Sequence, residues 1–241
     1  NANVNNIALS NFRLNDSYYM ASFIGEIDGG KYNNINIKNS GGGEGGFADR
    51  IKNGEFNNIK IDMTNPSRYA RSGFASIIYN GIFKNIEIIH SGLSESGFSE
   101  EIYDGDFRNI KIVGIGEKKG HLSAGFSRSF GNGYFQDILL ENFSADIGFG
   151  KNHNSSYAKN IIIRNANLGS GFGNIDNAEN ILLENLTITE DGFGRAGNAK
   201  NIILRNIDFI SSVDKGGEAY GFGSVKYADN IILENLRFIG N

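Results

Sequence analysis

The sequence predicts an all-β fold in which a single chain winds as a parallel β-helix, or solenoid, of about ten coils. Three observations predict it. Nine phenylalanines keep a fixed distance to a following Asn-Ile or Asp-Ile pair, 12 residues in six repeats and 9 residues in three. The interval from each isoleucine to the next phenylalanine varies from 11 to 20 residues, and aliphatic residues alternate after each isoleucine. A chain that keeps one spacing and relaxes the other is expected to stack coils with one variable edge.

A strand is predicted at the anchor isoleucine of each repeat. The anchor and the residue two positions later are aliphatic in all ten repeats. Two-residue alternation is typical of a strand with one buried face, so these positions predict two aliphatic ladders inside the coil. The anchors are Ile7, Ile35, Ile59, Ile86, Ile110, Ile138, Ile161, Ile181, Ile202 and Ile231.

A turn is predicted four residues after the anchor, where asparagine recurs. Asparagine tolerates the left-handed conformation of a sharp bend, and stacked asparagines can hydrogen-bond along the column. These residues are Asn11, Asn39, Asn142, Asn165, Asn185, Asn206 and Asn235.

The nine phenylalanines predict a continuous internal column. They are Phe23, Phe47, Phe74, Phe98, Phe126, Phe149, Phe172, Phe193 and Phe222. Three residues before the anchor, a second ladder changes from aromatic rings to alanines where the spacing shortens, which indicates a tighter coil because interiors are close-packed. It runs Tyr32, Phe56, Phe83, Phe107, Phe135, Ala158, Ala178, Ala199 and Ala228. After each Gly-Phe pair the alternation is too short to assign a strand.

Composition argues against several classes of function. The chain has no cysteine, which removes disulfide and thiolate chemistry, and its net charge of −4 argues against a nucleic-acid partner. No apolar run approaches 18 residues, so this segment is expected to contain no membrane span. Residues 1–241 are predicted to form one continuous solenoid without recognisable capping coils, and therefore a fragment of a longer protein. No cofactor is predicted.

The line Lys-Asn-Ile-Ile-Ile-Arg-Asn-Ala-Asn-Leu (159–168) resembles the repeat of pectate-lyase-like parallel β-helices. The line Ser-Gly-Phe-Ala-Ser-Ile-Ile-Tyr-Asn-Gly-Ile-Phe-Lys-Asn-Ile-Glu-Ile (72–88) is similar to the GLUG repeat of filamentous-haemagglutinin-like and autotransporter proteins, with Phe where Leu is usual. This resemblance implies a right-handed helix, a Gram-negative host, and a location that is secreted or at the cell surface. Many unrelated activities occupy such folds.

One outward row predicts a contact stripe in the second half of the chain. The residue after the anchor is a large aliphatic there, and a stripe of on the order of a few hundred Å² reaches the size at which exposed patches mark contacts. It comprises Leu139, Ile162, Leu182, Ile203 and Ile232. Docking of a partner, cover by segments of the same protein, and simple β-propensity all remain open. The neighbouring row alternates in charge, which predicts cross-strand pairs; it is Glu141, Arg164, Glu184, Arg205 and Glu234.

The variable edge supplies a second set of candidate contacts, because binding residues often lie on loops of a rigid scaffold. The candidates are Arg68, Tyr69, Arg71, Lys118 and Lys119. Simple tolerance of insertions at this edge is the alternative.

No catalytic or metal-binding residues are predicted. Two residues after each phenylalanine, acids do not occupy adjacent coils, and the Glu100-Glu101 pair is interpreted as solvated charge. His90, His121 and His153 share no repeat position. The chain is therefore expected not to be an enzyme.

The sequence favours a structural or adhesive segment of a large secreted bacterial surface protein, of the type V passenger kind. Its expected partners are a host surface, glycan or protein, and flanking segments of the same protein. Two alternatives remain open: a polysaccharide-binding or -cleaving β-helix, and the scaffold region of a secreted toxin.

Overall fold

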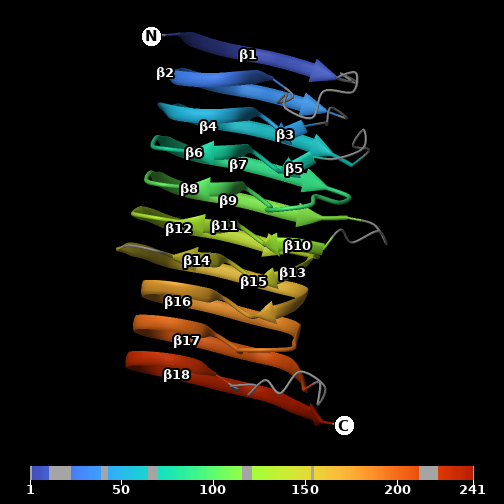
Figure 1. Cartoon of the computed structure of the whole chain (residues 1–241), viewed down its shortest axis with the longest axis vertical. Coiled ribbons are helices and arrows are strands. Elements are labelled where there is room, and N and C mark those ends of the chain that lie inside the picture. Colours follow the sequence, from blue (N-terminus) through green and yellow to red (C-terminus); the bar gives the residue numbers. More distant parts are fainter. Residues whose placement is uncertain are drawn as a thin grey trace.

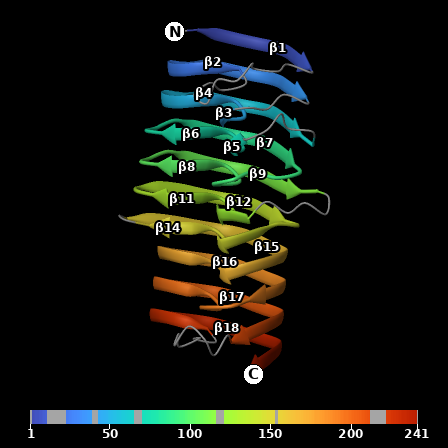
Figure 2. The same ribbon diagram turned by 45° about the vertical axis from the view of Figure 1, so that its right-hand side comes forward.

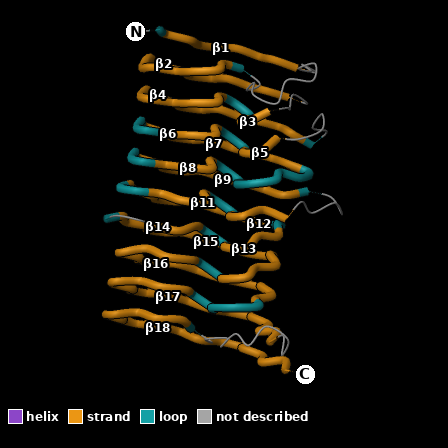
Figure 3. The backbone as a smooth tube through the Cα atoms, viewed as in Figure 1, coloured by secondary structure: helices purple, strands orange, loops and turns teal. Residues whose placement is uncertain are grey.

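The computed structural model describes residues 2–10, 23–38, 43–64, 70–115, 121–152, 155–211 and 222–240, and these residues form strands and the turns between them. The strands stack as coils along one axis from the N-terminal to the C-terminal end (Figure 1). Every strand pairing that joins successive coils is parallel, which confirms the predicted β-solenoid. Strand makes up most of the tube in each coil (Figure 3).

The anchor face is the sheet that holds the anchor isoleucines. Their row is continuous, because each anchor pairs in register with the anchor of the next coil. The strands of this face are β1 (Asn3–Ser10), β2 (Ile24–Lys38), β4 (Ala48–Met63), β7 (Ile82–His90), β9 (Asp106–Gly114), β12 (Gly133–Glu141), β15 (Ser156–Ser170), β16 (Gly173–Ile188), β17 (Gly194–Ser211) and β18 (Gly223–Gly240).

Two further faces close the coil on either side of the Gly-Phe pairs. The face after each phenylalanine is formed by the starts of the longer strands and by β6 (Ala75–Ile78), β8 (Ser99–Ile102), β11 (Ser127–Phe130) and β14 (Gly150–Asn152), which lie one above another in Figure 2. The face before each phenylalanine includes β3 (Gly43–Gly45), β5 (Ala70–Ser72), β10 (His121–Ala124) and β13 (Ser144–Ile147).

Asparagines in the left-handed conformation form two corners of the coil. The predicted corner is confirmed from Asn142 onward, where five successive asparagines have φ between 53° and 60°. Asn11 and Asn39 lie outside the described residues. A second corner, which the sequence reasoning missed, lies directly before the anchor and has φ of 53–57° at all ten anchors, with Asp137 in the place of asparagine at one of them. Its side chains also form a ladder, as in the bonds from Asn109 to Asn85 and from Asn201 to Asn180.

The core confirms the predicted phenylalanine column. The nine rings follow one another from Phe23 to Phe222, with neighbouring ring centroids 4.8–5.3 Å apart. They are stacked from Phe47 onward, whereas Phe23 is tilted by 34° against Phe47. The second column stacks in the same way from Tyr32 to Phe135. The two columns meet edge to face, as Phe98 does with Phe107 at 5.7 Å and 90°. This is the geometry that aromatic quadrupoles prefer.

The second column ends where predicted, because Phe135 pairs in register with Ala158 and alanine continues the row in the following coils. Ala158, Ala178 and Ala199 are buried in this row, and from Phe172 onward the chain takes three fewer residues from the phenylalanine to the anchor, as a close-packed interior with smaller side chains requires.

The glycine of the Gly-Phe pair permits close contact between coils. A Cβ added to Gly97 would lie 2.0 Å from the carbonyl oxygen of Gly125 on the next coil. No side chain fits there, which explains why glycine precedes phenylalanine in successive coils.

Candidate functional site

The structure brings the five residues of the contact stripe together. Leu139, Ile162, Leu182, Ile203 and Ile232 pair in register on the anchor face. Their side chains point away from the core and are partly exposed, reaching 36% at Ile232. The stripe ends at Leu139, because its partner on the preceding coil is Lys111. The stripe is thus a continuous aliphatic strip along half of one face.

The charge row beside the stripe is confirmed. A nitrogen of Arg164 lies 2.6 Å from Glu141, and Arg205 lies 2.6 Å from Glu234 and 3.6 Å from Glu184. On the first half of the same face, Glu87 bridges Lys60 at 2.8 Å and Lys111 at 3.3 Å. The hydrogen bond from Lys60 holds the pKa of Glu87 below its ordinary value. Exposed pairs contribute little energy each, and their main effect is to fix the register of the coils.

The loop candidates are only partly placed. Arg68, Tyr69, Lys118 and Lys119 lie outside the described residues. Arg71 lies in β5, and its guanidinium group contacts three carboxylates: Glu44 at 2.8 Å, Glu100 at 3.4 Å and Glu95 at 3.7 Å. Arg71 is therefore the centre of an ion-pair network.

This network continues onto the next coils. Arg128 bridges Glu100 at 3.0 Å and Glu101 at 3.3 Å. The hydroxyl of Ser123 donates a hydrogen bond of 3.2 Å to Glu95. The network lies in the angle between the two faces that meet at the Gly-Phe pair, since Glu44 and Arg71 come from one face and Glu100 and Arg128 from the other.

Glu100 corrects one sequence interpretation. It is 8% exposed and bound by two arginines, so it is not a solvated surface charge. Burial raises its pKa, whereas the positive charges of Arg71 and Arg128 oppose the rise. A carboxyl group with a raised pKa can act as a proton donor, and equally it can be part of a structural ion-pair network.

One repeat position carries the sequence signal of this network. Three residues before the phenylalanine, successive coils carry Glu44, Arg71, Glu95 and Ser123. The signs alternate from coil to coil, as they do in the row beside the stripe.

The histidines occupy unrelated environments. His90 is 4% exposed, and neither ring nitrogen has a hydrogen-bond partner among the described residues. Burial lowers its pKa to about 4, so the ring is neutral near pH 7. His121 is exposed and lies 2.6 Å from Asp146. His153 lies outside the described residues.

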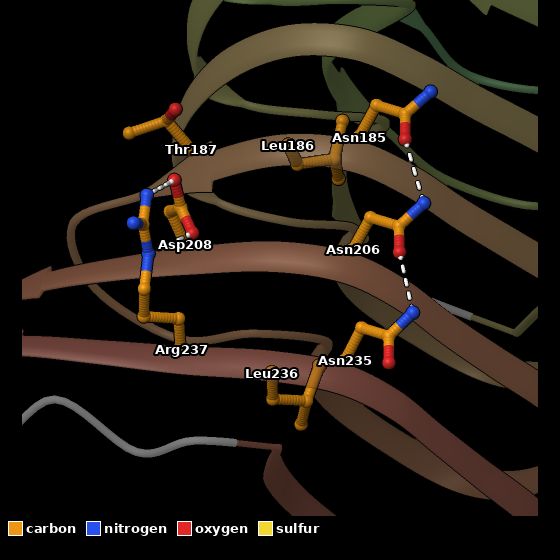
Figure 4. Close-up of a pocket in the computed structure, with 8 residues that line it drawn as sticks. All are labelled: Asn185, Leu186, Thr187, Asn206, Asp208, Asn235, Leu236 and Arg237. Atoms are coloured by element: carbon orange, nitrogen blue, oxygen red, sulfur yellow. Dashed lines mark hydrogen bonds and ion pairs between the residues drawn. The ribbon is translucent and has the colours of Figure 1, made fainter.

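An open groove follows the predicted asparagine corner, four residues after the anchor (Figure 4). One wall is the ladder of Asn185, Asn206 and Asn235, whose amides bond to one another at 2.9–3.0 Å. The other wall carries Thr187 and the ion pair between Arg237 and Asp208. The polar groups bond to each other across successive coils, so this groove offers few unsatisfied groups to a ligand.

Among the described residues, no cluster of three or more His, Cys, Asp or Glu side chains is arranged to hold a metal ion. The same residues include no helix with the length and apolarity that a membrane crossing requires. Comparisons of this chain with protein-family models, with curated protein sequences and with solved structures found no match.

Proposed function

We propose that this chain is a rigid structural and adhesive segment of a large secreted surface protein, of the type V passenger kind that its GLUG-like repeats suggest. The observation that carries this proposal is the unbroken column of nine stacked phenylalanines. A core that is continuous along the axis links every coil to its neighbours, which suits a spacer that holds contact surfaces at a distance.

The asparagine ladders support the same role. They bind successive coils to each other at two corners, as in the bonds from Asn58 to Asn34 and from Asn235 to Asn206. Together with the ion pairs on the anchor face, they resist sliding of one coil over another. Stiffness of this kind is needed to project a contact site from a surface.

The contact surface that we propose for adhesion is the aliphatic stripe. Replacing Ile162 and Ile203 by lysine should abolish association through this face while leaving the fold intact, because both side chains point outward. Adhesion of chain-coated beads to immobilised matrix proteins, together with sedimentation velocity for self-association, measures the effect. The double variant Asn167→Lys and Thr187→Lys adds the same charge to another face and is the control. Equal losses in both double variants would count against the stripe.

The passenger assignment has a direct test in the complete coding sequence. The proposal expects an export signal or secretion domain, and a membrane translocator domain, in the same reading frame. A reading frame that encodes only a cytoplasmic enzyme around these coils would contradict it.

A polysaccharide-binding or -cleaving role is the second candidate. The buried Glu100 favours it, because a carboxyl group with raised pKa beside Glu95 and two arginines is a plausible arrangement for acid catalysis on sugars. A reducing-end assay on a panel of acidic and neutral polysaccharides tests cleavage. Turnover that is lost in Glu100→Gln would favour this candidate over the scaffold alone.

A further inference from the structure

Two exposed tyrosines form a stacked pair on the edge next to the glycine turn. The rings of Tyr79 and Tyr103 are 5.1 Å apart and inclined by 10°, and they are 40% and 52% exposed. They hold equivalent places on successive coils. The backbone amide of Tyr79 donates to the carbonyl of Ile51 and that of Tyr103 to the carbonyl of Ile78, both at 2.8 Å.

Gly131 takes the same place on the next coil. Its amide donates to the carbonyl of Ile102 at 2.7 Å, which continues the bonding pattern of the two tyrosines. Because glycine has no side chain, nothing from this position covers the ring face of Tyr103. One coil step spans roughly 5 Å, so a ring stacked on Tyr103 would take the place that a side chain at Gly131 would have.

Polar groups lie at the hydroxyl end of the Tyr103 ring. The Tyr103 hydroxyl donates to Glu101 at 3.2 Å, and the other oxygen of Glu101 lies 3.3 Å from Arg128. Ser129 is the register partner of Glu101. The negative charge of Glu101 raises the pKa of Tyr103, which keeps its hydroxyl protonated as a donor. A carboxylate therefore binds the hydroxyl end of this ring, and a guanidinium group lies beside that carboxylate.

A second tyrosine pair on the chain has no such opening. Tyr134 and Tyr157 also stack, with centroids 5.4 Å apart. The guanidinium group of Arg108 lies 5.1 Å from the centroid of the Tyr134 ring. On the other side, Asn177 is the register partner of Tyr157 on the next coil. Side chains thus flank this pair in both directions along the stack. The two pairs differ in the residue that follows on the next coil, and Gly131 is therefore the residue that leaves the ring face of Tyr103 uncovered.

We propose that Tyr103, Glu101, Arg128 and Gly131 form a subsite for one pyranose ring of a glycan. The C–H-bearing face of a sugar packs on the electron-rich face of an aromatic ring, and its hydroxyls match the carboxylate and guanidinium groups at the ring's edge. A nucleobase would also stack, but the net charge of −4 repels a phosphate backbone. This site lies apart from the aliphatic stripe. Absence of glycan binding would therefore count against this subsite alone, and absence of adhesion through the stripe would count against the adhesive segment alone.

The decisive variant is Gly131→Tyr. Gly131 is not among the residues with positive φ, so a side chain causes no backbone strain there. The new ring should extend the Tyr79–Tyr103 stack and fill the space for the sugar. Tyr103→Ala removes the platform itself, and Tyr134→Ala on the closed pair is the matched control.

A glycan array followed by titration calorimetry on the best ligand tests the proposal. We expect Gly131→Tyr and Tyr103→Ala each to weaken binding roughly 10-fold or more, and Tyr134→Ala to leave it unchanged. Unaltered melting temperatures would show that the fold is retained. An array without ligands, equal binding by all variants, or selective binding of aromatic peptides instead of glycans would overturn the proposal.

Discussion

The coils before and after Phe149 share one architecture but fill it differently. Up to that point two aromatic columns pack edge to face, and the chain takes 12 residues from the phenylalanine to the anchor. In the later coils alanine replaces the second column from Ala158 onward, the distance falls to 9 residues from Phe172 onward, and left-handed asparagines form the corner after the anchor from Asn142 onward. The phenylalanine column is common to both halves, whereas the corner after the anchor, the second column and the spacing change over three successive coils. One continuous column is thus sufficient to stack the coils, and the other column sets their width.

The largest expected effect is the loss of a ring in the wide half. Phe107 is fully buried and contacts rings of both columns. Phe107→Ala should lower the free energy of unfolding by roughly 3–5 kcal/mol, because it removes a buried ring and leaves a cavity. Urea unfolding followed by circular dichroism measures this loss.

The reciprocal variant is Ala178→Phe in the narrow half. A ring inserted into a filled interior should destabilise by roughly 1–3 kcal/mol. If Ala178→Phe were stabilising, the narrow half would contain unfilled space, and the link between alanine and a tighter coil would be wrong.

His90 should make the wide half sensitive to acid. Its folded-state pKa of about 4 lies below the ordinary value of 6.5, so between these values only the unfolded chain binds the proton. The free energy of unfolding should therefore fall as pH decreases from 6.5 to 4, by roughly 3 kcal/mol in total.

His90→Met tests the origin of this acid sensitivity. Methionine already occupies the same row at Met63, and the other register partner, Gly114, carries no charge. Urea unfolding between pH 7 and 4 should show a shallower pH dependence for this variant. An unchanged dependence would assign the effect to the carboxylates instead.

A smaller effect is expected at the asparagine corner after the anchor in the narrow half. Asn206 has φ of 54° and takes part in two ladder hydrogen bonds. Asn206→Ala should cost roughly 1–2 kcal/mol from left-handed strain alone, and Asn206→Gly should cost less because glycine accepts this conformation. Thermal melting compares the two. Equal costs would mean that the hydrogen bonds, rather than the backbone conformation, dominate.

The sequence was sufficient to predict features that repeat with a fixed period. The anchor row, the phenylalanine column and the change from Phe135 to Ala158 all follow from spacing and side-chain size. The face after the Gly-Phe pair was not assigned, because in β6 both Ala75 and Ser76 are buried and the two-residue alternation fails. Ser76 is buried although it lies on the outer side of the coil, where its hydroxyl is 3.5 Å from the carboxylate of Glu44.

The candidate sites were less predictable, because they depend on how two faces meet. The angle between the faces buries Glu100 and brings it to Arg71, and the alternating charges three residues before each phenylalanine do not show that the two faces meet there. The open face of Tyr103 likewise depends on a glycine 28 positions further along the chain.

The most direct test of the stacked solenoid is a set of electron–electron distances between spin labels. The chain has no cysteine, so pairs introduced by Ala8→Cys with Lys111→Cys or Ile203→Cys are the only labelling sites. These positions share one outward row of the anchor face. Four and eight coil steps predict backbone separations of about 19 Å and about 38 Å. A distance that doubles between the two pairs is the expected result; distances that are equal, or too broad to assign, would contradict a chain wound around one axis.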